Sequence, residues 1–154
     1  MGEELRTPLM ACTADELVYP EVEGATVEPV EEANLRDFSD IQRVAFGGEP
    51  LAEGESLSPP RGGGVLARIG GEAVSAAAWT PVLDGYSEIV GVATAEAWRR
   101  RGLAGLVTAA ASRAAFEAGA STCLLSPGNE TAQRVYARAG FHRIATMLHY
   151  SDPL

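Results

Sequence analysis

The sequence has 154 residues, of which 46% are hydrophobic, and its formal net charge is −9. This length and hydrophobic content suffice for one core, and we expect one globular unit. No apolar run approaches the roughly 20 residues that span a bilayer, no signal-peptide pattern opens the chain, and no basic stripe with interleaved aromatic residues occurs. We therefore expect a cytoplasmic protein without a membrane or nucleic-acid partner.

The charge is unevenly distributed along the chain. Residues 1–60 hold 14 acidic residues against 3 arginines, whereas residues 61–154 hold 7 against 9. Either this acidic third is a solvated surface, or it attracts a cationic substrate. Cys12 and Cys123 are isolated and have neither CxxC spacing nor a nearby histidine pair, so neither a disulfide framework nor a metal site is indicated.

The first half of the chain predicts an arm, a strand, a helix and a loop. Residues 1–24 are acidic, contain two prolines and show no sustained period, so we expect an N-terminal arm packed on a domain of residues 25–154. Alternation predicts a strand at 25–30, and helical spacing of apolar residues predicts a helix that ends near Gly47. Residues 48–64 are rich in Gly, Pro and Ser, which is typical of a loop.

The second half predicts a sheet with two further helices. Three strands at 65–69, 72–83 and 86–94, joined by tight turns, form an antiparallel meander. A helix over 103–118, a short strand at 122–126, a helix over 129–140 and one or two strands at 141–150 follow. This order predicts an α+β fold whose mixed sheet carries helices on its faces.

The stretch "RRRGLAG", Arg99 to Gly105, lies between the last meander strand and the following helix. The first N–H groups of a helix have no intrahelical partner and lie at the positive end of the helix dipole. A glycine there lets the backbone approach a bulky anion, so the stretch is suited to a pyrophosphate. The alternative is an ordinary helix start with solvated arginines.

Arg99, Gly102 and Ala104 match the pattern Arg-x-x-Gly-x-Ala, which here follows "EIVGVAT" and precedes "NETAQRVYARAGF". In this order the motifs resemble the GNAT superfamily of acyl-CoA-dependent N-acyltransferases, from about Val65 to Tyr150. The resemblance implies a mainly antiparallel sheet, flanked by helices and splayed between the family's fourth and fifth strands. It also implies an N-acetyltransferase that moves an acetyl group from acetyl-CoA to a primary amine by direct attack in a ternary complex, without a metal. Residues 1–24 fall outside the resemblance.

The resemblance also assigns roles to residues. It places the coenzyme A phosphates on the backbone amides of one run: Arg99, Arg100, Arg101, Gly102, Leu103, Ala104 and Gly105. It places the pantetheine arm along Val92, Ala93 and Thr94, with Asn129 near it. It makes Tyr136 the general acid near the thioester sulfur, and it makes Glu88, 14 positions before Gly102, the candidate base. We expect burial beside apolar neighbours to suit Glu88 to this role. Asn129 is equally interpretable as a helix N-cap, Tyr136 as a core residue, and Glu88 as a solvated glutamate with water as the base.

Two other functions stay open at this point. The chain is alternatively a non-catalytic acyl-CoA-binding regulatory module, or one half of a former two-domain acetyltransferase whose partner is another subunit, with a homodimer as one form. The acceptor is a small molecule or a peptide N-terminus. The acidic residues in and after the first helix favour a cationic acceptor: Asp37, Asp40, Glu49, Glu53 and Glu55.

Overall fold

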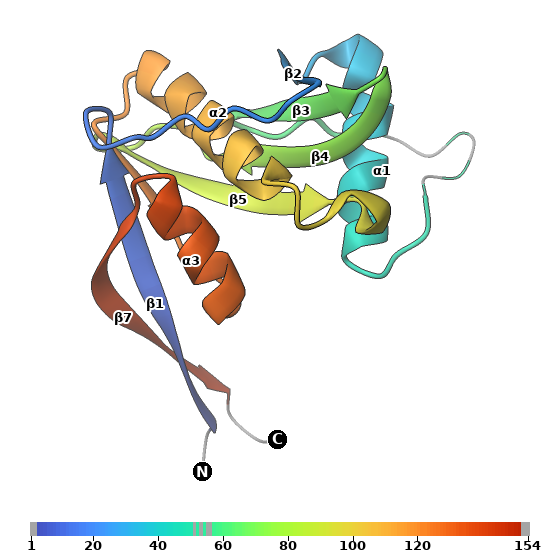
Figure 1. The fold of residues 1–154 in the computed structure, drawn as a ribbon. Helices are drawn as coiled ribbons and strands as arrows, with labels where there is room; N and C mark the ends of the chain where they lie inside the picture. The colour runs from blue at the N-terminus through green and yellow to red at the C-terminus, as the bar shows by residue number, and fades with distance from the viewer. Residues whose placement is uncertain (1–2, 51, 53, 55–56, 152–154) are drawn as a thin grey trace.

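The computed structural model describes residues 3–50, 52, 54 and 57–151 (Figure 1). In chain order the elements are β1 (Glu3–Thr13), β2 (Ala25–Pro29), a 3₁₀ turn (Glu32–Asn34), α1 (Leu35–Ala45), β3 (Gly63–Ile69), β4 (Glu72–Trp79), β5 (Tyr86–Thr94), a second 3₁₀ turn (Glu96–Trp98), α2 (Leu103–Glu117), β6 (Thr122–Leu125), α3 (Glu130–Arg138) and β7 (His142–Ser151). None of the helices in this described part is long and apolar enough to cross a membrane.

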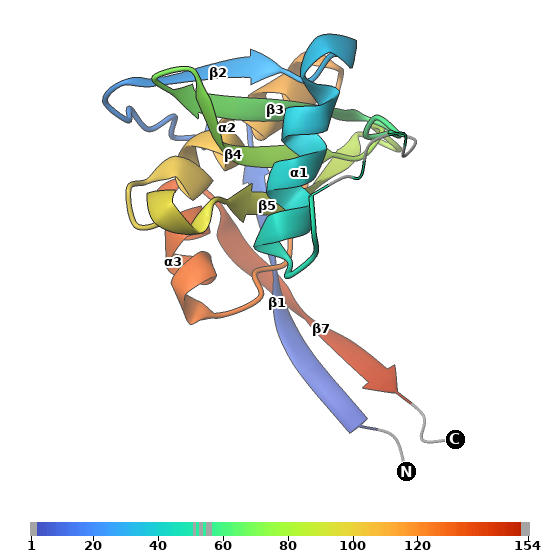
Figure 2. The same cartoon turned by 90° about the vertical axis from the view of Figure 1, so that its right-hand side faces the viewer.

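The strands form one sheet in the order β2-β3-β4-β5-β6-β1-β7. Only the β5–β6 pair is parallel among these neighbours, so the sheet is mixed and mainly antiparallel, as the sequence predicts. Helix α1 crosses one face over β4 and β5, and α2 covers the other face with α3 beside it (Figures 1 and 2). Each face therefore has its own buried apolar cluster. The expected α+β fold is confirmed.

Strand β1 is the element that the sequence analysis did not predict. It pairs antiparallel with β6 on one side and with β7 on the other, so residues 3–13 lie inside the sheet. The β1–β7 ribbon extends beyond the helical layers, and both termini lie at its far end (Figures 1 and 2). A boundary at residue 24 between an arm and a domain stays a prediction, and the arm's first half contributes a strand to the domain's sheet.

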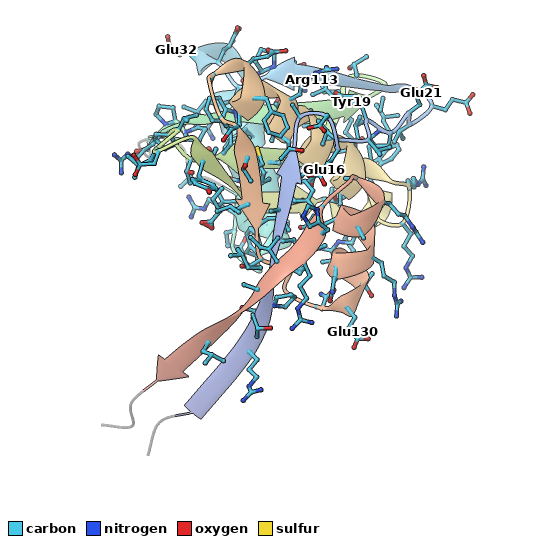
Figure 3. The ribbon with its side chains drawn as sticks, turned by 90° about the vertical axis from the view of Figure 1, so that its left-hand side faces the viewer. Glu16, Tyr19, Glu21, Glu32, Arg113 and Glu130 are labelled. Carbon is cyan, nitrogen blue, oxygen red and sulfur yellow. The ribbon has the colours of Figure 1, made fainter. Side chains whose placement is uncertain are left out.

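Residues 14–24 run from the end of β1 across the outer side of α2. The Val18 N–H donates to the Ala139 carbonyl at the end of α3 (2.9 Å). The Arg113 guanidinium of α2 lies 4.1 Å from the centre of the Tyr19 ring, and the two side chains lie together in Figure 3. This cover explains why α2, which lies between the sheet and the segment, is buried around most of its circumference.

Two irregularities in the pairing of β5 interrupt the regular sheet near its middle. Its parallel pairing with β6 ends at Glu88 opposite Leu124, although β5 continues to Thr94. On its other side, the register with β4 shifts between Ala76 and Ala78, where β5 carries one extra residue. An extra residue of this kind is a β-bulge, which bends a strand and leaves backbone groups out of the ladder.

Candidate active site

A pocket of about 460 Å³ lies between the end of β5, the first turns of α2 and α3, and the end of α1. Its lining residues are Ala45, Phe46, Val92, Ala93, Thr94, Trp98, Arg99, Arg100, Gly102, Leu103, Ala104, Gly105, Asn129, Thr131, Ala132, Val135 and Tyr136. The structure thus brings together all but two of the residues that the sequence nominated for the site. Arg101 and Glu88 do not line this pocket.

The start of α2 presents unpaired backbone donors to the pocket. Gly102 is the N-cap, with φ of 82° and no side-chain cap, and the Leu106 N–H makes a 3.1 Å bond to the Gly102 carbonyl. The amides of Leu103 to Gly105 precede this first intrahelical donor and have no partner within the helix. A Cβ at Gly102 would have 3.5 Å to Val22, so the backbone conformation rather than the space requires glycine. Such a start is suited to an anion.

The three arginines before Gly102 have different surroundings. The Arg99 Nε donates to the Thr94 carbonyl (3.2 Å), which ties the turn to the end of β5. Arg100 lines the pocket and has φ of 66°, a left-handed conformation that is uncommon outside glycine. Arg101 instead lies over the Trp98 ring, 4.8 Å from its centre. The Trp98 Nε1 donates to Glu72 (2.7 Å), so Arg101 helps to brace the turn from outside the pocket.

Helix α3 contributes Asn129 and Tyr136 to the opposite wall. The Asn129 side chain accepts a hydrogen bond from the Ala132 N–H (2.8 Å), so Asn129 is an N-cap and a lining residue at once. Tyr136 packs at the edge of the core under α2, and burial raises the pKa of its phenol. Its hydroxyl has no hydrogen-bond partner among the described residues. The phenol is therefore protonated at neutral pH and available as a donor.

Glu88 lies on the other face of β5. Val90 packs in the cluster under α1, and Glu88 shares its face because side chains alternate along a strand. The carboxylate is exposed, contrary to the burial that the sequence suggested, and it lies at the last residue of β5 that pairs with β6. Tyr136 and Glu88 thus flank the place where β5 and β6 part, but they do not meet in one pocket.

Several lining residues escaped the sequence analysis. Thr131 and Val135 are one helical turn apart, as are Ala132 and Tyr136. Helical spacing from Tyr136 could therefore have predicted which side of α3 lines the pocket. Phe46, 70% exposed at the end of α1, gave no such signal because its place at the pocket depends on how α1 packs across β5.

The two cysteines do not supply a nucleophile. Cys12 of β1 lies directly opposite Cys123 of β6, and both are buried, free thiols. Burial raises the pKa of Cys12 to about 12 and that of Cys123 to about 11, so neither forms a thiolate readily. Within the described residues, no three His, Cys, Asp or Glu side chains converge as metal ligands would.

An uncapped helix start that opens on a parted sheet, with a protonated phenol on the facing helix, is an arrangement suited to an extended anionic ligand. The comparisons identify the class more closely. Residues 26–141 match the model of the Acetyltransferase (GNAT) family. The chain belongs to this family.

Solved structures of similar proteins agree with this assignment. A GCN5-related N-acetyltransferase from Kribbella flavida is 37% identical with a TM-score of 0.79, over 97% of this chain and 58% of that one. A GCN5-related N-acetyltransferase from Sphaerobacter thermophilus (24% identity, TM-score 0.72, 97% and 52% covered) and a putative GNAT acetyltransferase from Novosphingobium aromaticivorans (20%, 0.72, 95% and 63%) share the fold. The chain therefore spans 52–63% of the length of these proteins. No curated protein matches the sequence.

Proposed function

We propose that the protein is an N-acetyltransferase that moves the acetyl group of acetyl-CoA to a primary amine by direct attack in a ternary complex. The observation that carries this proposal is that two features open on one pocket: the uncapped start of α2, and the Tyr136 hydroxyl, which no described residue hydrogen-bonds. Family membership supports acetyl-CoA as the co-substrate.

The chain's own groups fit the donor from end to end. The amides of Leu103 to Gly105 are free to hold the pyrophosphate, and Arg99 and Arg100 add attraction for its charge. The backbone of Val92, Ala93 and Thr94 borders the pocket where β5 has left β6, so its peptide groups suit the amide-bearing pantetheine arm. Asn129 is the proposed contact from α3.

The proposed chemistry uses one proton donor and one proton acceptor. The amine nitrogen attacks the thioester carbonyl carbon, the C–S bond breaks, and the departing thiolate takes the proton of the Tyr136 hydroxyl. The proton of the attacking amine passes through a water to Glu88, which does not itself line the pocket. A positioned acid or base of this kind contributes on the order of 10²- to 10⁴-fold.

We propose a cationic acceptor, either a small molecule or a peptide N-terminus. Asp37 and Asp40 line a hollow of about 400 Å³ that also contains Arg99, and Asp37 is paired with Arg68 at 2.9 Å. The support therefore rests on the net charge of −9 and on exposed carboxylates such as Glu49. Glu53 and Glu55 lie outside the described residues. A cytoplasmic location stays a prediction.

We also propose that a second copy of the chain pairs along β7. The opposite edge strand, β2, has 5 residues and ends in Pro29, whereas β7 has 10 residues without proline. Ile144 and Leu148 of β7 are 53% and 48% exposed. A long unprotected edge invites another strand, and a projecting two-stranded ribbon is marginally stable alone.

Light scattering over a concentration series tests this pairing. We expect a dimer that becomes monomeric in the double variant Ile144→Glu, Leu148→Glu and persists in Val18→Glu, which changes an equally exposed residue away from β7. A monomeric wild type at about 100 µM, far above usual specific affinities, would refute the proposal.

Calorimetric titration with acetyl-CoA, followed by release of CoA thiol with a panel of amines, tests the enzymatic function. We expect binding and amine-dependent thiol release. Binding without release for any amine would favour the non-catalytic module, and the absence of binding would overturn both.

A further inference from the structure

One side chain of α1 is bonded to the bulge of β5. The Gln42 Nε2 donates a 2.8 Å hydrogen bond to the carbonyl of Gly91, a residue 49 positions later in the chain. Gly91 has φ of 62°, and a Cβ there would lie 2.3 Å from the Gln42 Nε2. The left-handed conformation requires glycine. A side chain at residue 91 would in addition displace the Gln42 amide, which is the end of a flexible side chain, from the bulge.

This bond fixes the orientation of the next amide as well. In a planar trans peptide the carbonyl of one residue and the N–H of the next point in opposite directions. Because the Gly91 carbonyl is directed at Gln42, the Val92 N–H is directed away from it. Val92 lines the pocket and packs against the apolar cluster on the α2 side of the sheet.

The same bond joins two walls of the pocket. Gln42 lies one turn before Ala45 and Phe46, which line the pocket at the end of α1, and Gly91 immediately precedes Val92 on β5. Both Gln42 and Gly91 are half-buried, so water competes little for the carbonyl. A substitution of Gln42 would thus alter the placement of the Val92 N–H and leave most of the residues that line the pocket unchanged.

We propose that Gln42 is a positioning residue that, by holding the Gly91 carbonyl, aims the Val92 N–H into the pocket, where this amide donates a hydrogen bond to a carbonyl oxygen of the bound acetyl-CoA. The inference rests on the proposed function and adds to it the residue that sets the donor's hydrogen-bonding partner on β5. Gln42 itself touches no reacting atom.

The amide nitrogen chemical shift of Val92 in the free protein, which responds to hydrogen bonding at the preceding carbonyl, and calorimetric binding of acetyl-CoA test the proposal together. Gln42→Leu keeps the bulk of the side chain but loses the donor. We expect the Val92 amide resonance to shift, and acetyl-CoA affinity to fall by about tenfold, the size of one lost hydrogen bond. Gln42→Lys keeps a donor of sufficient reach, and we expect it to reverse the resonance shift and to bring the affinity to within about threefold of the wild-type value.

Asn34→Ala is the matched control because Asn34 anchors the other end of α1. Its side chain donates to the Pro29 carbonyl (3.0 Å) and to Glu28 (2.6 Å), far from the bulge. We expect this variant to lower the melting temperature without changing the Val92 amide resonance or acetyl-CoA affinity. Equal losses of affinity in Asn34→Ala, an unchanged Val92 resonance in Gln42→Leu, or no recovery in Gln42→Lys would each overturn the proposal.

The chemical-shift measurement separates this inference from the function on which it rests. A wild-type protein that bound no acetyl-CoA would refute the proposed function and, with it, the contact of Val92 with the donor. A shifted Val92 amide resonance in Gln42→Leu would even then uphold the orientation of the Gly91–Val92 peptide by Gln42.

Discussion

Helices α2 and α3 begin at the same pocket, but their first turns are built in opposite ways. Gly102 starts α2 in a left-handed conformation and offers no side chain to the free amides. Asn129 starts α3 in an extended conformation, and its side chain accepts from the Ala132 N–H at 2.8 Å. Three arginines precede the first start, and Glu130 follows the second. Only the start of α2 thus combines unused donors with positive charge.

This difference predicts which end of the bound donor lies at which helix. A side-chain cap satisfies the donors that an anion would otherwise bind, whereas an uncapped glycine start leaves them available. The phosphates of the donor are therefore expected at α2 and its thioester end beside Tyr136 on α3. Matched changes at the two helix starts test this assignment directly.

The largest effect is expected from Gly102→Glu. The new carboxylate adds bulk, like charge and an unfavourable left-handed conformation where the pyrophosphate is expected, so acetyl-CoA affinity should fall by at least about 100-fold. Calorimetric titration of the folded variant measures the loss. Gly128→Glu, just before the start of α3 and with open space around it, should bind normally. Equal losses of acetyl-CoA affinity in both variants would contradict the assignment of the phosphates to the start of α2.

Tyr136→Phe should lower kcat by about 100-fold, the usual worth of a positioned acid, and should change acetyl-CoA affinity by less than about threefold. Because burial raises the pKa of this phenol above its ordinary value of 10.0, wild-type activity that depends on it should persist up to that pH and decline above it. Steady-state kinetics across pH measure both effects. Tyr19→Phe keeps the ring under Arg113 and should be neutral. An unchanged kcat in Tyr136→Phe would reject the tyrosine as the acid.

Glu88→Gln should lower kcat/KM for the amine at neutral pH by at least about tenfold. The reason is that an amide cannot take the proton of the attacking amine. Rates at saturating acetyl-CoA over a series of amine concentrations measure the change, with Glu96→Gln, an exposed residue just after β5, as the control. An unchanged kcat/KM in Glu88→Gln would assign proton removal to water alone.

Asn129→Ala should destabilise the protein by about 1 kcal/mol, because the Ala132 N–H loses its cap. Chemical denaturation measures this loss. Asn129→Asp keeps a capping oxygen and should recover the stability, but its charge should weaken acetyl-CoA binding several-fold if Asn129 also contacts the donor. Unchanged affinity in Asn129→Asp would leave Asn129 with a capping role alone.

The smallest effect concerns the acceptor. If exposed carboxylates select a cation, kcat/KM for a polyamine should exceed that for glutamate at low ionic strength and should fall a few-fold as salt screens the field beyond about 10 Å. Initial rates at two salt concentrations measure it. Equal rates for the two amines at low salt would show that the acidic third is only a solvated surface.

Local signals in the sequence were sufficient for much of the molecule. The apolar spacing of α1 and α2, the tight turns of the meander and the glycine at the start of α2 act within a few residues, and the structure has these elements where they were expected. The lining residues of Val92 to Thr94 and of Arg99 to Gly105 could be named because each set is consecutive along the chain, with Arg101 as the exception. Arg101 does not line the pocket because its guanidinium lies over the ring of the neighbouring Trp98.

Only the tertiary structure decided the rest, because it depends on residues far apart in the chain. Strand β1 exists through its pairing with β6 and β7, more than 100 residues away, and an acidic stretch with prolines carries no local signal of that pairing. The placement of Glu88 and Tyr136 on opposite faces follows from how α1 and α2 pack against β5. The bond from Gln42 to Gly91 depends on the same packing, since a hydrogen bond across 49 positions forms only once the helix lies on the bulge.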